Sequence, residues 1–225
     1  MSRRTPPVAV LFDMDGLLLD SERLAQRATQ MTATALGHSI PEDVSLAMIG
    51  LGTDAVERLL VAELGSAYSP RIYQAAWTAH YGALVAEGVP PKPGALVALQ
   101  ALCDAGVGCA VATSTATSLA RQKLERSGLL PYLQAVVGRD AVVHGKPAPD
   151  LYILAAQQLG TTATHCWAFE DSLPGLHAAV ASGARTHWIP DIAPIKRSDV
   201  PPGVETVASL AEISRWLGAA VPPQR

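Results

Sequence analysis

Short, continuous apolar runs recur along the chain, and this pattern limits the fold more than any other feature of the sequence. The runs cover residues 8–12, 108–112, 134–137, 165–169 and 184–189. Apolar residues that do not alternate with polar ones are typical of parallel strands buried on both faces. Helical patterns separate the later runs, at residues 94–105, 117–126, 150–159 and 174–181. This alternation predicts an α/β fold with a doubly wound parallel-sheet, Rossmann-like core.

One long segment lacks this rhythm. Between the first apolar run and residue 94, the chain shows helical patterns and almost no strand signal. The expected helices cover residues 21–36, 41–48, 54–64 and 70–87. We therefore predict two domains: an α/β core made of residues 1–18 and 89–225, and an α-helical domain inserted at residues 19–88.

Charge and composition exclude several classes of partner. The net charge of -3 and the pI near 6 give no reason to expect nucleic acid or an anionic membrane as a partner. No apolar run reaches the roughly 18 residues that span a bilayer, and the first run is too short for a signal-peptide core. The three cysteines have no metal-ligand spacing. We interpret them as core residues in a reducing compartment. We expect a cytoplasmic protein.

Polar residues directly follow three of the apolar runs. They are Asp13 and Asp15 after the first run, Thr113 and Ser114 after the second, and Glu170 and Asp171 after the fourth. Ligands of a parallel α/β sheet bind outside the carboxyl ends of its strands. The pattern therefore predicts one site to which all three pairs contribute.

Three of these residues would crowd carboxylates together. Asp13, Asp15 and Asp171 would repel one another unless a cation lay between them. Because their oxygens are hard ligands and neither imidazole nor thiolate is near in sequence, the cation that fits best is Mg²⁺. Once the metal neutralises the site, one carboxylate is free to attack phosphorus as a nucleophile.

Other residues of the expected site suit a phosphoryl group. Lys146 lies in a proline-braced loop before a helix, where its charge can neutralise a nucleophile and a phosphoryl oxygen. Thr113 offers a hydroxyl and Ser114 a backbone N–H at a helix start, and we expect this turn to cap the following helix as well. Gly16 permits a tight turn that brings backbone N–H groups to the phosphoryl group.

The order of these motifs resembles that of a known superfamily. Asp13-Met14-Asp15-Gly16, Thr113-Ser114, Lys146-Pro147 and Glu170-Asp171-Ser172 match the four motifs of the haloacid dehalogenase (HAD) superfamily, in order. The inserted helical domain is similar to the cap of its β-phosphoglucomutase-like and phosphosugar phosphatase branch. The match spans roughly residues 8 to 217. One motif alone would be weak support, but four in order are specific.

The resemblance implies roles for the acidic residues. Asp13 resembles the nucleophile of the superfamily. Asp15 resembles the general acid that protonates the leaving oxygen and then the base that activates water, and it would also bind the metal through its backbone carbonyl. Asp171 resembles the direct acidic ligand of the metal, and Glu170 would act on the same ion directly or through water.

The resemblance also implies what the chain acts on. Thr113, the Ser114 amide and Lys146 would hold the phosphoryl group, so the expected enzyme is a Mg²⁺-dependent phosphatase. Its substrate would be a small phosphorylated metabolite, a sugar or polyol phosphate, and we expect it to act as a monomer. From the cap, Glu22, Gly52 and Thr53 are candidate contacts to the substrate.

The chain departs from the mutases of this branch. They use a histidine in the first cap helix and an arginine in the cap loop, where this sequence has Ala25 and about Thr53. Neither residue can take those roles, which favours a phosphatase over a phosphosugar mutase. Asp15 and Asp171 argue against dehalogenation, because the dehalogenases lack the second aspartate and the metal. A non-catalytic, phosphate-responsive binding module is a further alternative.

Overall fold

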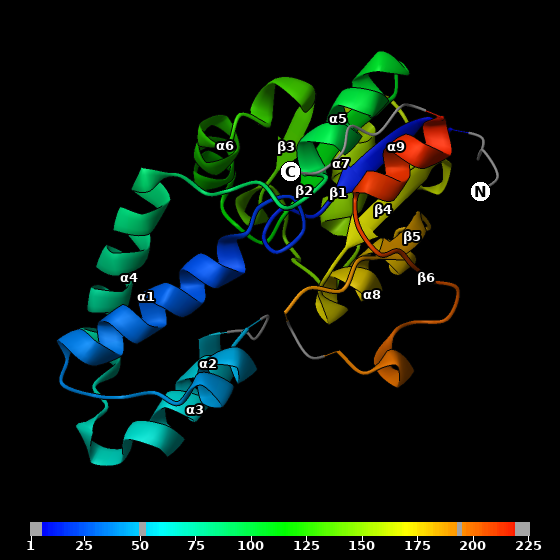
Figure 1. Cartoon of the computed structure of the whole chain (residues 1–225). Coiled ribbons are helices and arrows are strands. Elements are labelled where there is room, and N and C mark those ends of the chain that lie inside the picture. Colours follow the sequence, from blue (N-terminus) through cyan, green and yellow to red (C-terminus); the bar gives the residue numbers. More distant parts are fainter. Residues whose placement is uncertain (1–5, 50–52, 193–194, 219–225) are drawn as a thin grey trace. The chain divides into compact units, whose positions relative to one another are not determined.

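The computed structural model describes residues 6–49, 53–192 and 195–218, which fall into two compact units (Figure 1). Of these residues, 6–20, 90–191 and 195–218 form the unit that contains the sheet. Residues 21–49, 53–89 and 192 form the second unit, which is helical. The roles of the two units as catalytic core and cap stay predictions.

Within the described residues, six parallel strands form one sheet in the order β3-β2-β1-β4-β5-β6. The strands are β1 (Ala9–Phe12), β2 (Gly108–Ala112), β3 (Ala135–Val137), β4 (Cys166–Glu170), β5 (Arg185–Trp188) and β6 (Glu205–Thr206). The predicted α/β class and parallel sheet are confirmed. Only β6 has no counterpart among the predicted strands, because two residues carry no apolar run.

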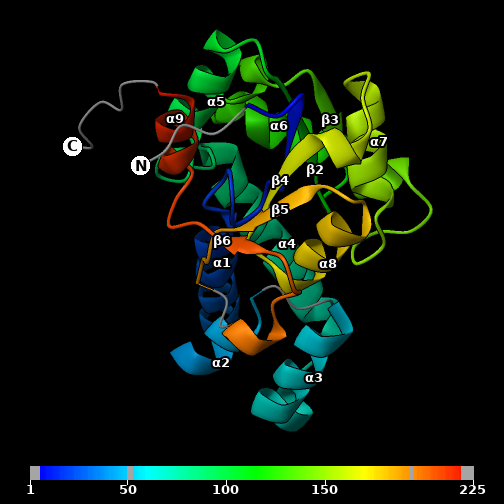
Figure 2. The same ribbon diagram turned by 90° about the vertical axis from the view of Figure 1, so that its right-hand side faces the viewer.

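Helices cover both faces of this sheet (Figure 2). They are α5 (Ala95–Asp104), α6 (Thr117–Arg126), α7 (Asp150–Gln158), α8 (Leu173–Ala181) and α9 (Ala211–Leu217). On one face, small residues such as Ala110 and Ala168 pack against α7 and α8. On the other face, Phe169 stacks on Trp216 of α9 at a ring separation of 6.2 Å. Because both faces are covered, β1, β2 and β3 carry no charged or polar side chain.

Short 3₁₀ turns connect several of these elements. They are Gly65–Ala67, Leu130–Tyr132, Arg139–Ala141, Ala163–His165 and Arg197–Asp199.

The helical unit has an apolar core of its own. Its helices are α1 (Ser21–Ala35), α2 (Glu42–Ala47), α3 (Thr53–Leu64) and α4 (Pro70–Glu87). Buried Ile40, Leu60 and Tyr73 belong to one cluster that joins these helices. In addition, the indole N–H of Trp77 on α4 donates to the hydroxyl of Thr29 on α1 at 3.1 Å. These contacts hold the four helices together without help from a sheet.

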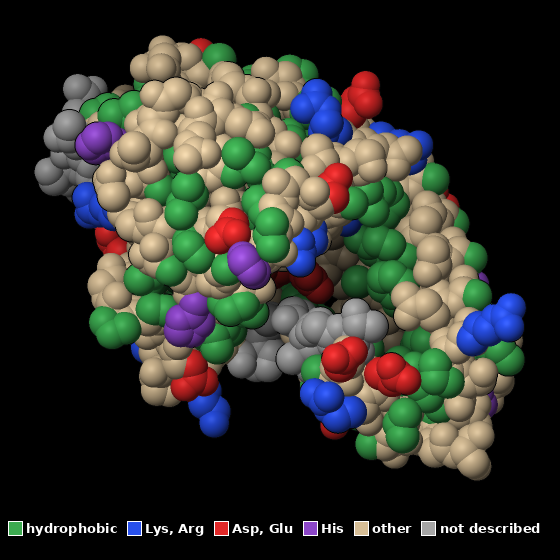
Figure 3. All heavy atoms as spheres, turned by 180° about the vertical axis from the view of Figure 1, so that it is seen from behind, with side chains coloured by type: hydrophobic (Ala, Val, Ile, Leu, Met, Phe, Trp, Pro, Cys, Tyr) green, Lys and Arg blue, Asp and Glu red, His purple; other side chains and the backbone are tan. Residues whose placement is uncertain are grey.

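Charged side chains are mixed over the described surface in Figure 3, which shows no extended basic area on that face. Polyanion-binding proteins usually carry such an area. Among the helices of the described residues, none combines the length and hydropathy that a membrane crossing requires.

In the sheet unit, two paired segments carry the chain out to the helices and back. The N–H of Asp20 donates to the carbonyl of Pro90 at 2.8 Å, and the N–H of Lys92 donates to the carbonyl of Leu18 at 2.9 Å. The ammonium of Lys92 contacts Asp191 and lies 3.6 Å from Asp20. One cation thus joins three chain segments of this unit.

Replacing Lys92 by Met should lower the free energy of unfolding by about 1–2 kcal/mol, because it leaves the largely buried carboxylate of Asp191 without this cation. Urea denaturation measures the change. Arg185→Met is the matched control, because it breaks an exposed ion pair with Glu205, and it should change stability by less than about 0.5 kcal/mol. Equal effects of the two variants would contradict this account.

Candidate active site

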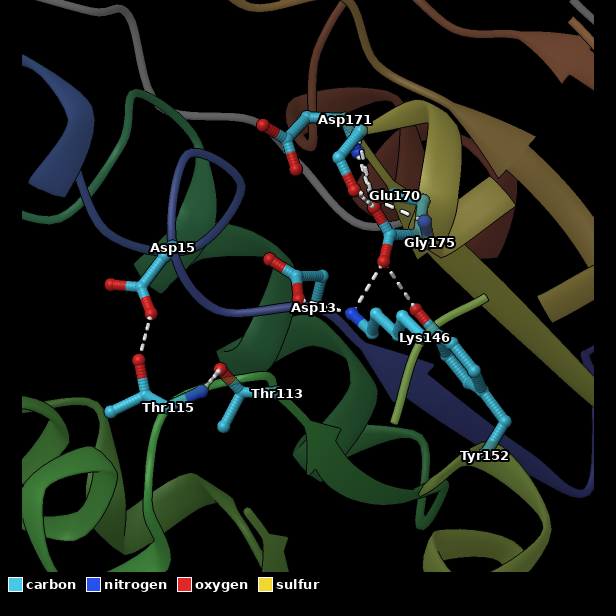
Figure 4. Close-up of polar contacts among 10 residues, drawn as sticks. Asp13, Asp15, Thr113, Thr115, Lys146, Tyr152, Glu170, Asp171 and Gly175 are labelled. Carbon is cyan, nitrogen blue, oxygen red and sulfur yellow. Dashed lines mark hydrogen bonds and ion pairs between the residues drawn. The ribbon is translucent and has the colours of Figure 1, made fainter. Parts of the chain in front are cut away.

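Asp13 comes directly after β1, where the sheet positions its backbone. Its N–H donates to the carbonyl of Phe169 at 3.0 Å, which continues the ladder between β1 and β4. Its side chain is only 8% exposed and accepts a hydrogen bond from the ammonium of Lys146 (Figure 4). The same ammonium lies 2.5 Å from a carboxylate oxygen of Glu170. A buried lysine therefore joins two buried acids.

Glu170 is the last residue of β4 and is fully buried. Its Oε1 accepts from Lys146 and from the hydroxyl of Tyr152 at 2.8 Å. Its Oε2 accepts from the backbone N–H groups of Asp171 and Ser172 and from the hydroxyl of Ser172, each at 3.0 Å. Five donors thus surround one carboxylate (Figure 4), which leaves its oxygens little capacity for a metal ion.

Burial and charge shift the pKa values of the paired groups. Burial raises the pKa of Asp13 to about 8, the Lys146 ammonium opposes this, and the nearby carboxylates of Glu170 and Asp15 add to it. Burial would lower the pKa of Lys146, but Asp13 and Glu170 together raise it above its ordinary value. Lys146 therefore stays charged, and a second cation beside Asp13 would favour the ionised carboxylate.

The residues present fit a hard metal ion. Asp13, Glu170 and Asp171 are buried, and one carboxylate oxygen of each lies within 4.8 Å of the others. All three donors are oxygens, as Mg²⁺ requires. Because Glu170 already accepts five hydrogen bonds, Asp13 and Asp171 are better placed to act as direct ligands. That Glu170 acts on the ion directly or through water stays a prediction.

Asp15 lies in the loop after β1, and two side chains hold its carboxylate. The hydroxyl of Thr115 donates to Oδ2 at 2.6 Å (Figure 4), and the ammonium of Lys123 donates to Oδ1 at 2.8 Å. Gly16 takes a positive φ of 86°, which glycine adopts without strain. The N–H of Gly16 donates to the carbonyl of Leu19 at 2.9 Å. Gly16 therefore shapes the turn, and its own N–H is already hydrogen-bonded within that turn.

Thr113 and Ser114 follow β2, as predicted. Thr113 is buried, and its Oγ1 accepts from the N–H of Thr115 at 3.1 Å, while Ser114 is exposed. The expectation that this turn caps the next helix is wrong. Helix α6 starts at Thr117, and Asp140 accepts from the N–H and the hydroxyl of Thr117 at 2.7 Å each. A carboxylate from a distant loop takes the capping role.

Two of the three predicted substrate contacts of the cap, Glu22 and Thr53, lie in the helical unit. Glu22 lies in the first turn of α1 and is half-buried. Gly52 lies outside the described residues, and Thr53 is the first residue of α3. Ala25 lies on α1 and is half-buried. None of these placements tests the predicted contacts to a substrate.

Three polar residues around the site were not predicted: Thr115, Lys123 and Tyr152. Lys123 carried a readable signal, because it shares the buried face of α6 with Ala120 and Leu124, where an apolar residue is expected. In the sequence, Tyr152 resembles an ordinary core aromatic residue of α7. The hydrogen bond from its hydroxyl to Glu170 connects it with the site.

Comparison with known proteins agrees with this geometry. A family model described as haloacid dehalogenase-like hydrolase matches residues 8–183. The chain belongs to this family. The predicted resemblance is confirmed, and so is the expectation of an enzyme.

Two curated relatives and one solved structure illustrate the family. Fructose-1-phosphate phosphatase YqaB of Escherichia coli is 35% identical over 77% of this chain and 92% of its own length. Hexitol phosphatase A of Escherichia coli is 35% identical over 77% of this chain and 78% of its own length. The crystal structure of a HAD family hydrolase from Deinococcus radiodurans R1, with bound phosphate and sodium, has a TM-score of 0.81 and 28% identity. The match covers 96% of this chain and 100% of that one.

Gly175 makes the packing around Glu170 testable. A Cβ at this position would lie 1.7 Å from Oε1 of Glu170, so Gly175→Ala should displace that carboxylate and lower the free energy of unfolding by about 1–3 kcal/mol. Gly82→Ala in α4 is the matched control, because its added Cβ meets nothing within 4 Å and alanine favours a helix. Urea denaturation compares the two, and a Gly175→Ala protein as stable as the control would contradict this packing.

Proposed function

We propose that this protein is a Mg²⁺-dependent phosphatase that hydrolyses a small phosphomonoester through a phosphoaspartate on Asp13. The observation that carries the proposal is the buried contact between Asp13 and Lys146, with Asp171 beside it at the carboxyl ends of β1 and β4. A buried carboxylate next to a fixed cation can approach a dianionic phosphate that it would otherwise repel.

Asp13 and Asp171, together with the backbone carbonyl of Asp15, would hold Mg²⁺. When bound, the ion neutralises charge on the phosphoryl oxygens and on Asp13. Lys146 supplies a second positive charge, and Glu170 keeps it in place. The hydroxyl of Thr113 already accepts from Thr115, so its own proton is left to donate to the phosphoryl group, beside the Ser114 N–H.

In the first half-reaction, a carboxylate oxygen of Asp13 attacks phosphorus in line with the leaving oxygen. The P–O bond to that oxygen breaks, and Asp15 gives it a proton to form the alcohol. Asp13 then carries the phosphoryl group as an acyl phosphate.

In the second half-reaction, Asp15 is ionised and takes a proton from water. The water oxygen attacks phosphorus, the bond between phosphorus and Asp13 breaks, and inorganic phosphate leaves. Asp13 and Asp15 return to their starting states. The same carboxylate thus acts first as acid and then as base.

The proposed substrate is a sugar or polyol phosphate. Two relatives named for fructose 1-phosphate and for hexitol support this class, and bound phosphate in the Deinococcus structure supports a phosphate site in the family. Action as a monomer in the cytoplasm stays a prediction from the sequence.

Release of inorganic phosphate from a panel of sugar and polyol phosphates tests the chemistry. Wild-type protein should turn over at least one compound with Mg²⁺, and chelator should abolish the turnover. Asp13→Asn should reduce it by about a thousandfold or more, since the nucleophile is lost. Asp104→Asn, an exposed residue at the end of α5, is the matched control and should keep wild-type activity. Full activity of Asp13→Asn would refute the proposed nucleophile.

The same panel separates hydrolysis from phosphosugar mutation. A mutase would convert a sugar 1-phosphate into its 6-phosphate when primed with a sugar bisphosphate, without releasing phosphate. Hydrolysis is preferred here because Ala25 offers no side-chain group that could take part in proton transfer.

Metal binding can be measured without turnover. Millimolar Mg²⁺ should raise the midpoint of thermal unfolding of the wild-type protein, because an ion that binds only the folded state stabilises it. The shift should vanish in Asp171→Asn, which loses a proposed ligand, and persist in Asp104→Asn. An equal shift in Asp171→Asn would exclude Asp171 as a ligand.

A further inference from the structure

We propose that Lys123 is a positioning residue that orients the carboxylate of Asp15 for proton transfer. The inference rests on the proposed function, because it concerns the acid and base of that reaction. It also explains why a lysine occupies the buried face of a short amphipathic helix.

The placement of Lys123 is unusual for a lysine. It lies on α6 between Ala120 and Leu124 on the buried face, and its side chain is only 3% exposed. Taking an ammonium out of water is unfavourable unless an anion and hydrogen bonds compensate. Here the compensating anion is Asp15, 2.8 Å away. An apolar residue would satisfy the packing of α6 alone, so the packing does not account for the charge.

The two contacts to Asp15 complement each other. Lys123 donates to Oδ1 at 2.8 Å, and Thr115 donates to Oδ2 at 2.6 Å. Both donors belong to the segment that follows β2, one in the loop and one in the helix. With a donor on each oxygen, the carboxylate cannot rotate about its Cβ–Cγ bond without breaking a hydrogen bond. The side chain of Asp15 is nevertheless 23% exposed, so it stays accessible to a reacting group.

This restraint bears on proton transfer. An acid must lie within hydrogen-bond reach of the leaving oxygen, and a small displacement can reduce the rate about a hundredfold. Without Lys123, the Asp15 carboxylate would lose the hydrogen bond at Oδ1 and sample other orientations. The loss should therefore be greatest for substrates whose leaving oxygen needs a proton.

The test compares two leaving groups. The first substrate is an alkyl phosphate, namely the best sugar or polyol phosphate of the panel, and its leaving oxygen must be protonated. The second is p-nitrophenyl phosphate, which releases a phenolate that needs little protonation to leave. In Lys123→Met, kcat/KM should fall at least about tenfold more for the alkyl phosphate than for p-nitrophenyl phosphate. Lys123→Arg should restore part of the loss, because it keeps the charge.

Arg121→Met is the matched control, since it removes one charge from the exposed face of the same helix. It should leave kcat/KM unchanged for both substrates. Equal loss on both substrates, or no loss, would overturn the inference while the phosphatase itself stands. A wild-type protein that releases phosphate from no compound would overturn the proposed function and this inference together.

A second measurement does not need activity. Urea denaturation measures the unfolding equilibrium of the wild-type protein, Lys123→Met, Asp15→Asn and the double variant. The four values give the energetic coupling between the two side chains. We expect a coupling of at least about fivefold in the unfolding equilibrium constant. Strictly additive effects would mean that the two side chains do not hold each other, and would overturn the inference.

Discussion

The ammonium of Lys146 lies between the carboxylates of Asp13 and Glu170, and the rest of the site depends on this contact. Glu170 accepts from Lys146, from Tyr152 and from three donors of Asp171 and Ser172. These bonds fix a buried anion, which in turn fixes the cation beside Asp13. Because its charge is compensated on both sides, the lysine can remain buried and ionised next to the proposed nucleophile.

The parallel sheet is what brings these groups together. Phe12 lies opposite Phe169 in the register of β1 and β4. The next residues, Asp13 just after β1 and Glu170 at the end of β4, therefore lie side by side. Thr113 leaves β2 on the other side of β1. A chain with this strand order gathers polar residues at one edge even though they are far apart in sequence. The chemistry therefore follows from topology as much as from the residues themselves.

Much of this could be predicted from the sequence. Unbroken apolar runs indicate buried parallel strands, and the polar residues after them indicate the site, since both signals are local. Partner choice is not local. Glu170 looks like one more metal ligand until its five donors are known. The place of Lys123 on the apolar face of its helix indicates burial but does not name Asp15 as its partner. Asp140 caps a helix that begins 23 residues earlier. Contacts between distant segments decide these roles, and no pattern in one segment records them.

The central claim is that Asp13 carries the phosphoryl group. Quenching the protein during turnover and reducing the acyl phosphate with borohydride converts a phosphorylated aspartate into homoserine, which peptide mass spectrometry locates. The account predicts homoserine at position 13, only when substrate and Mg²⁺ are both present. Homoserine at position 15 instead, with position 13 unchanged during turnover, would contradict it.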